Sequence, residues 1–118
     1  MDARVKRVVE IITERLVSTP SEQAMSRAVN LSPARLRQLF KEETGLSPLQ
    51  YVKQLRMQRA AMLLVTSFLS IKEVTFATGS ADVSHFVRDF KKKYGMTPGA
   101  FRTQSRSVSE CSPPNNRK

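Results

Sequence analysis

A pattern of twelve residues occurs twice in this chain, and both copies carry the same signals for ending one helix and starting the next. The first copy is Phe40–Tyr51 (FKEETGLSPLQY) and the second is Phe90–Phe101 (FKKKYGMTPGAF). In each copy the Gly is typical of a left-handed helix end. The hydroxyl residue and Pro that follow are typical of a helix start. The repeat therefore predicts that one unit of supersecondary structure is built twice.

The remaining apolar residues recur at intervals of three and four, which is the spacing of one helix face. Gly is scarce, with 4 among 118 residues, and no stretch alternates apolar and polar residues as a strand would. We therefore expect an all-α fold of about seven helices. The predicted helices are 2–17, 20–29, 33–43, 48–65, 70–78 and 83–94, with a short last helix around Phe101.

Short polar residues precede several of these helices and predict their first residues. Three segments, Thr19–Glu22, Ser47–Gln50 and Ser70–Glu73, have the spacing of a capping box, in which side chains and backbone N–H groups satisfy one another. Ser32 and Asp82 are predicted N-caps of the third and sixth helices. The residues expected to face inward are Val5, Val8, Val9, Ile12, Leu16, Ala24, Met25, Ala28, Leu36, Leu39, Phe40, Phe86 and Phe90.

Each copy of the repeat belongs to a short helix, a turn and a second helix. These pairs are 20–29 with 33–43, and 70–78 with 83–94. Such a pair is the helix-turn-helix arrangement, whose second helix enters the major groove of DNA. The helix 48–65 that joins the pairs is about 27 Å long. With a recognition helix packed at each end, a rigid strut of this length is suited to setting the two near the separation of successive major grooves, which is about 34 Å. A monomer of this design is suited to reading about two turns of duplex.

The charge balance points to a polyanionic partner. Lys and Arg number 20 against 10 Asp and Glu, a net charge of +10, which is typical of proteins that bind nucleic acid. The longest apolar run, 60–65, is too short to span a membrane, and the N-terminus lacks the pattern of a signal peptide. We therefore expect a cytoplasmic protein that does not bind membranes.

Catalytic and metal chemistry are not expected. The chain has one His and one Cys, His85 and Cys111, which is too few for a disulfide or a Cys/His zinc cluster. These two residues lie far apart in the sequence and in segments of different character, so we do not expect them to form a Cys–His catalytic pair. No cofactor is expected, and an enzyme is the weakest of the possible functions.

Residues 104–118 are rich in Ser, Pro and Asn, and we expect them to form a disordered polar tail.

Three separated motifs resemble the DNA-binding domain of the AraC/XylS family of bacterial transcription regulators. Residues 31–47 are similar to the first recognition helix and its exit, 55–64 to the linker helix, and 79–101 to the second unit. The resemblance covers about 5–102. It implies a domain over 1–103, made of a first helix-turn-helix unit (1–47), a linker helix (48–65) and a second unit (66–103).

The resemblance also implies promoter binding by a bacterial regulator, usually with activation through contact with RNA polymerase. Most members carry a separate effector-binding domain, for which this chain has no room. It therefore resembles the small standalone type, or a truncated relative.

Candidate contacts with double-stranded DNA lie on the second helix of each pair. Arg pairs well with guanine and Gln with adenine, and the base-reading positions of the family map onto Ala34, Arg37 and Gln38. The candidate base contacts are Ala34, Arg35, Arg37, Gln38, Ser84, His85 and Arg88. The candidate phosphate contacts are Lys41, Arg56, Lys91 and Lys92. For Arg35 and Arg37 a solvated surface charge is the alternative, and for Arg56 it is a structural role.

We therefore expect a sequence-specific transcription activator that inserts the helices 33–43 and 83–94 into successive major grooves as a monomer. Two alternatives stay open. A truncated regulator would act through protein–protein contacts. A nonspecific architectural protein would bind the phosphate backbone of every duplex with equal affinity.

Overall fold

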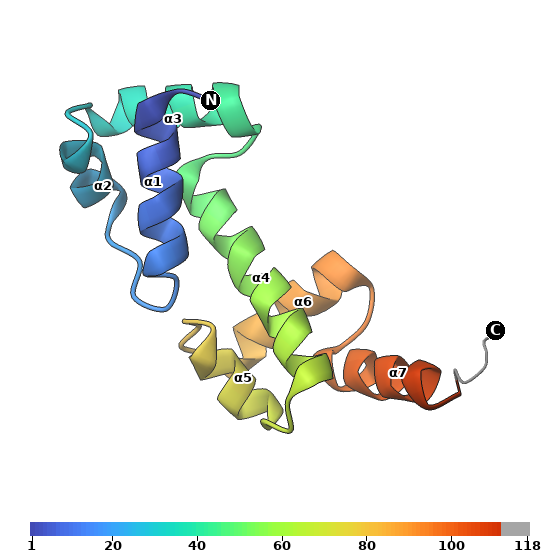
Figure 1. Cartoon of the computed structure of the whole chain (residues 1–118). Helices are drawn as coiled ribbons and strands as arrows, with labels where there is room; N and C mark the ends of the chain where they lie inside the picture. Colours follow the sequence, from blue (N-terminus) through green and yellow to red (C-terminus); the bar gives the residue numbers. More distant parts are fainter. Residues whose placement is uncertain (112–118) are drawn as a thin grey trace. The chain divides into compact units, whose positions relative to one another are not determined.

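The computed structural model describes residues 1–111, with side chains up to residue 106, and it contains only helices, turns and short connections over that range (Figure 1). The all-α prediction is confirmed. The helices are α1 (Ala3–Glu14), α2 (Glu22–Ala28), α3 (Pro33–Thr44), α4 (Pro48–Thr66), α5 (Ile71–Ala77), α6 (Val83–Tyr94) and α7 (Pro98–Cys111).

The helices form two compact units that divide inside α4, between Arg56 and Met57. Unit 1 contains α1, α2, α3 and the first part of α4, and unit 2 contains the rest of α4 with α5, α6 and α7. Each unit therefore has one helix-turn-helix pair, α2 with α3 and α5 with α6. The predicted fold of two helix-turn-helix subdomains is confirmed.

Each unit has its own apolar core, and the repeated sequence occupies the same place in both. The Phe40 and Tyr51 rings meet edge to face, with centroids 5.3 Å apart and planes at 84°. Phe90 and Phe101 meet in the same way at 5.3 Å and 80°. The buried core of unit 1 is Val5, Val8, Ile11, Ile12, Met25, Val29, Leu36, Leu39, Phe40 and Val52. That of unit 2 is Met57, Ala60, Leu64, Val74, Phe86 and Phe90.

Most predicted helix ends are present. Ser32 and Asp82 cap α3 and α6 through their side chains. The capping box Ser70–Glu73 forms at α5, and at α4 Ser47 and Gln50 exchange side-chain-to-backbone hydrogen bonds in the same manner. The glycines after α3 and α6, Gly45 and Gly95, have φ values of 83° and 79°. A side chain is strained in that left-handed region, which explains Gly at both helix ends.

The predicted start of α2 is wrong by two residues. The N-cap is Ser21, whose hydroxyl accepts a hydrogen bond from the Ala24 N–H at 3.1 Å. The hydroxyl of Thr19 instead donates to the carbonyl oxygens of Arg15 and Leu16, both at 3.1 Å. Thr19 is therefore used to finish the turn after α1 and is not available as a cap for α2.

The predicted inward face of α2 is also partly wrong. Ala24 and Ala28 are exposed, whereas Met25, Ser26 and Val29 are buried. The larger apolar side chains of Met25 and Val29 remove more surface from water, and this favours the observed rotation of the helix. The buried Ser26 hydroxyl donates to the Gln23 carbonyl oxygen at 2.8 Å, so its burial leaves no unpaired donor.

The predicted tail begins too early, because α7 continues to Cys111 where we expected a short helix ending near residue 103. Long-range hydrogen bonds fix the first half of this helix. The Arg102 Nε donates to the Leu64 carbonyl oxygen at 2.9 Å, and Arg106 donates to that of Ser67. The Arg106 guanidinium also lies 4.7 Å from the centroid of the Phe68 ring. The remaining part of the predicted tail, 112–118, lies outside the described residues.

Candidate nucleic-acid interface

Helix α3 is held by three buried side chains on one face, and the residues of its other face are exposed. Leu36, Leu39 and Phe40 belong to the core of unit 1. Because residues three and four apart share a helix face, the positions that are off the face of these anchors form the opposite surface. That surface contains all the predicted contacts of this helix. The exposed residues are Ala34, Arg35, Arg37, Gln38 and Lys41.

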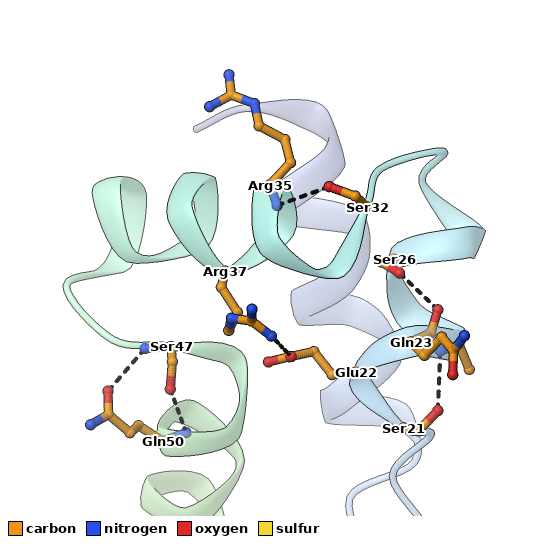
Figure 2. A network of polar contacts seen from close by, with 10 residues as sticks. Ser21, Glu22, Gln23, Ser26, Ser32, Arg35, Arg37, Ser47 and Gln50 are labelled. Carbon is orange, nitrogen blue, oxygen red and sulfur yellow. Dashed lines mark hydrogen bonds and ion pairs between the residues drawn. The ribbon is translucent and has the colours of Figure 1, made fainter.

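The two arginines of this surface point in different directions. Figure 2 shows Arg35 extending away from the helix on one side and Arg37 turning toward α2 on the other. The Arg35 Nη1 donates to Gln38 Oε1 at 3.4 Å, within α3. The Arg37 Nη1 donates to Glu22 Oε1 at 2.5 Å, across to α2. Arg35 and Arg37 therefore lie at opposite edges of the surface that α3 presents.

Glu22 is a residue of this site that sequence reasoning missed. We expected it to close a capping box from the third position of α2, but it is the first residue of that helix because Ser21 is the cap. At the first position its carboxylate does not turn back to the helix end. It forms an ion pair with Arg37 in which the two side chains are 28% and 51% exposed.

Helix α6 presents the second group of predicted contacts. Its buried anchors are Phe86 and Phe90. The Asp82 cap accepts a hydrogen bond from the His85 N–H at 3.1 Å, and this bond holds the pKa of the Asp82 carboxyl below its ordinary value. The predicted contacts are all exposed, namely Ser84, His85, Arg88, Lys91 and Lys92.

Positively charged side chains are concentrated toward the C-terminal end of α6. Arg88 is 70% exposed, with its Nε 4.0 Å from Asp89 Oδ1. Lys91, Lys92 and Lys93 form the last turn, where positive charge also interacts favourably with the helix dipole. This end of α6 therefore has the composition of a surface that binds phosphate groups.

Arg56 has contacts of a different kind from the other predicted DNA contacts. Its Nε donates to the Leu16 carbonyl oxygen at 3.0 Å, and its Nη2 lies 3.5 Å from Thr19 Oγ1. Partial burial lowers the pKa of the guanidinium. The side chain joins α4 to the end of α1, so the geometry favours the structural role over the predicted phosphate contact.

Within the described residues, no three His, Cys, Asp or Glu side chains lie close enough together to hold a metal ion. None of the helices in that part of the chain is long and apolar enough to cross a membrane.

Comparison with known proteins identifies the same architecture. The helix-turn-helix domain family matches residues 25–104. The chain is 37% identical over 95 residues to the HTH-type transcriptional regulator GlxA of Rhizobium meliloti, a match that covers 80% of this chain and 29% of that protein. It is 35% identical over 103 residues to the arabinose operon regulatory protein of Escherichia coli, covering 86% of this chain and 35% of that protein. The chain thus spans about a third of the length of these relatives.

Solved structures of DNA-binding domains have the same fold. The DNA-binding domain of AdpA, in complex with a target DNA, superimposes with a TM-score of 0.84 at 25% identity, covering 90% of this chain and 96% of that one. An AraC-type regulator from Chromobacterium violaceum superimposes with a TM-score of 0.80 at 26% identity, covering 86% and 91%. Because the family match extends over most of the chain, the protein belongs to the AraC/XylS family, whose shared helix-turn-helix domains serve DNA-binding transcription regulators and not enzymes.

Proposed function

We propose that the chain regulates transcription by reading a specific promoter sequence with α3 and α6, each placed in the major groove. One observation carries this proposal. Both helices are fixed from behind by buried residues, and both have exposed Arg, Gln, Lys, Ser or His side chains on their outer faces. A rigid helix with such an outer face is what direct reading of base edges needs.

The proposed roles follow from side-chain chemistry. Arg37 and Gln38 on α3, and Arg88 on α6, are the strongest candidates for base contacts, because Arg and Gln make bidentate pairs with guanine and adenine. Ala34, Ser84 and His85 complete the base-reading surfaces, and Arg35 contacts a base or a phosphate. Lys41, Lys91 and Lys92 bind phosphates and fix the register of the helices. Arg56 is omitted from this set because its guanidinium is occupied by Leu16.

The partner we propose is double-stranded DNA, bound by a monomer whose two helices occupy successive major grooves. The solved AdpA domain, which is bound to a target DNA, supports the partner. A relative from Escherichia fergusonii, 32% identical over 108 residues, is named the transcriptional activator RhaS. By analogy, we propose that this chain activates transcription through contact with RNA polymerase, in the bacterial cytoplasm at the nucleoid.

Selection from a random duplex library tests this function. The selection is run near physiological ionic strength, about 0.15 M, because salt suppresses nonspecific binding more strongly than specific binding. Enrichment of one site about two helical turns long supports reading by both helices. Enrichment of a site half that length implicates one helix. Equal recovery of all sequences by the folded protein would replace the proposal with architectural binding, and loss of all DNA binding would favour a protein partner.

A further inference from the structure

We propose that Glu22 is a positioning residue for base recognition, and that it orients Arg37 toward a guanine and away from the phosphate backbone. The inference rests on the proposed function, since it assumes that α3 reads bases. Glu22 lies on α2, outside the helix that carries the base contacts. It acts through Arg37.

The ion pair leaves most of the Arg37 guanidinium available. Glu22 Oε1 accepts from Nη1 at 2.5 Å, and among residues 1–106 the Arg37 side chain has no other hydrogen bond. A guanidinium has five N–H donors in a fixed planar arrangement. With Nη1 held, the edge formed by Nε and Nη2 still presents two parallel donors. That edge matches the O6 and N7 acceptors of guanine in the major groove.

Both ends of the pair belong to fixed backbone. Glu22 is the first residue of α2, directly after the Ser21 cap, and Arg37 lies one residue after the buried Leu36 of α3. Met25 of α2 and Leu36 of α3 share the core of unit 1. The carboxylate therefore restricts a long side chain that would otherwise sample many rotamers, and an arginine restricted in this way loses less entropy on binding.

The charge of Glu22 also disfavours the main competing contact. An arginine near DNA is attracted to the closest phosphate oxygen, which carries no sequence information. A carboxylate bonded to the same guanidinium repels phosphate, whereas guanine O6 and N7 are neutral acceptors. The Arg35 side chain has no such partner, because its hydrogen bond is to the uncharged amide of Gln38. Of the two arginines, Arg37 is thus the one prepared to read a base.

The test compares base preference in three single variants. Selection with wild type and Arg37→Ala identifies the base pair whose preference the arginine creates, and binding to four duplexes that differ only there measures the discrimination. We expect Glu22→Gln to reduce that discrimination about two- to fivefold, the range that corresponds to an exposed ion pair. Affinity for a random duplex should stay equal or rise, because one negative charge is lost. In the Arg37→Ala background, Glu22→Gln should have no effect on this preference.

Glu10→Gln is the matched control. It removes the same charge from the same unit and breaks an exposed ion pair with Arg7 on α1, so it should leave the base preference unchanged. Circular dichroism and thermal unfolding of each variant verify the fold. A Glu22→Gln protein with unaltered preference at the Arg37 position, or with preferences reduced equally at all positions, overturns the inference while the proposed function stands. Absence of any preference in the wild type overturns both.

Discussion

The Arg56 side chain reaches from α4 to the end of α1 and donates from Nε to the Leu16 carbonyl oxygen at 3.0 Å. Leu16 lies in the turn that follows α1, and its carbonyl oxygen also accepts from the Thr19 hydroxyl, so the Arg56 guanidinium ties α4 to that turn with a second, charged donor. Arg56→Ala should therefore destabilise unit 1 by about 1–2 kcal/mol, since it removes a charge-assisted hydrogen bond and the packing of the aliphatic stem. Urea unfolding measures the loss in the free energy of unfolding, and hydrogen exchange of the α1 amides shows that the loss lies in unit 1.

The salt dependence of DNA binding distinguishes this structural role from a phosphate contact. Each phosphate contact contributes about 0.9 to the slope of log affinity against log salt. We expect Arg56→Ala to leave the slope unchanged at a temperature where the variant is folded. A decrease in the slope of about 0.9 would instead identify Arg56 as a phosphate ligand.

The edge-to-face pairs of the two cores should differ in strength despite their similar geometry. Tyr51 meets Phe40 alone among the aromatic residues of unit 1 that the structure describes, whereas Phe101 meets both Phe90 and Tyr94, the latter at 5.4 Å. An aromatic pair adds about 0.5–1.5 kcal/mol beyond burial. Phe101→Leu should therefore lower the unfolding free energy of its unit more than Tyr51→Leu lowers that of unit 1. Denaturant unfolding of both variants gives the comparison, and equal losses would contradict it.

The helix ends were predictable because they depend on residues close together in the chain. The boxes at Ser47–Gln50 and Ser70–Glu73 and the left-handed Gly45 and Gly95 are decided within a few residues. The repeat also predicted the equivalent placement of the rings of Phe40 and Phe90. For the outer faces of α3 and α6, the helical period was sufficient to predict which side chains are exposed.

The differences arose where the local sequence allows two outcomes, or where a contact joins distant segments. At α2, both Thr19 and Ser21 are suitable caps, and only the packing of the preceding turn decides that Thr19 bonds to Arg15 and Leu16. The position of Glu22, and with it the ion pair to Arg37, follows from that choice. The part of α7 beyond residue 103 contains Arg106, which donates to the Ser67 carbonyl oxygen, and no local pattern encodes this long-range contact.

The capping box of α5 should make the stability of unit 2 depend on pH. The Ser70 N–H donates to the Glu73 carboxylate at 2.8 Å, and this bond lowers the pKa of Glu73. A carboxyl whose pKa is lower in the folded state stabilises the fold above its unfolded pKa, about 4.3, and loses that contribution as the pH falls through the folded value. Glu73→Gln keeps a hydrogen-bond acceptor but not the charge. Its melting temperature should be below that of the wild type at pH 7, and the two should converge near pH 3. A constant difference at both pH values would exclude the ionised box as the cause.

Arg88 and Lys92 lie one helical turn apart on the exposed face of α6, so they are a matched pair for testing whether the second unit reads bases. Arg88→Ala should weaken binding to the selected site by about 1–3 kcal/mol and relax the preference at one base pair. Lys92→Ala should weaken binding to all sequences alike and reduce the salt slope by about 0.9, because it removes one phosphate contact. Titrations of the selected duplex and of its single-base variants at several salt concentrations separate the two effects. If both substitutions weaken all duplexes equally, α6 binds only the phosphate backbone, and base recognition belongs to α3.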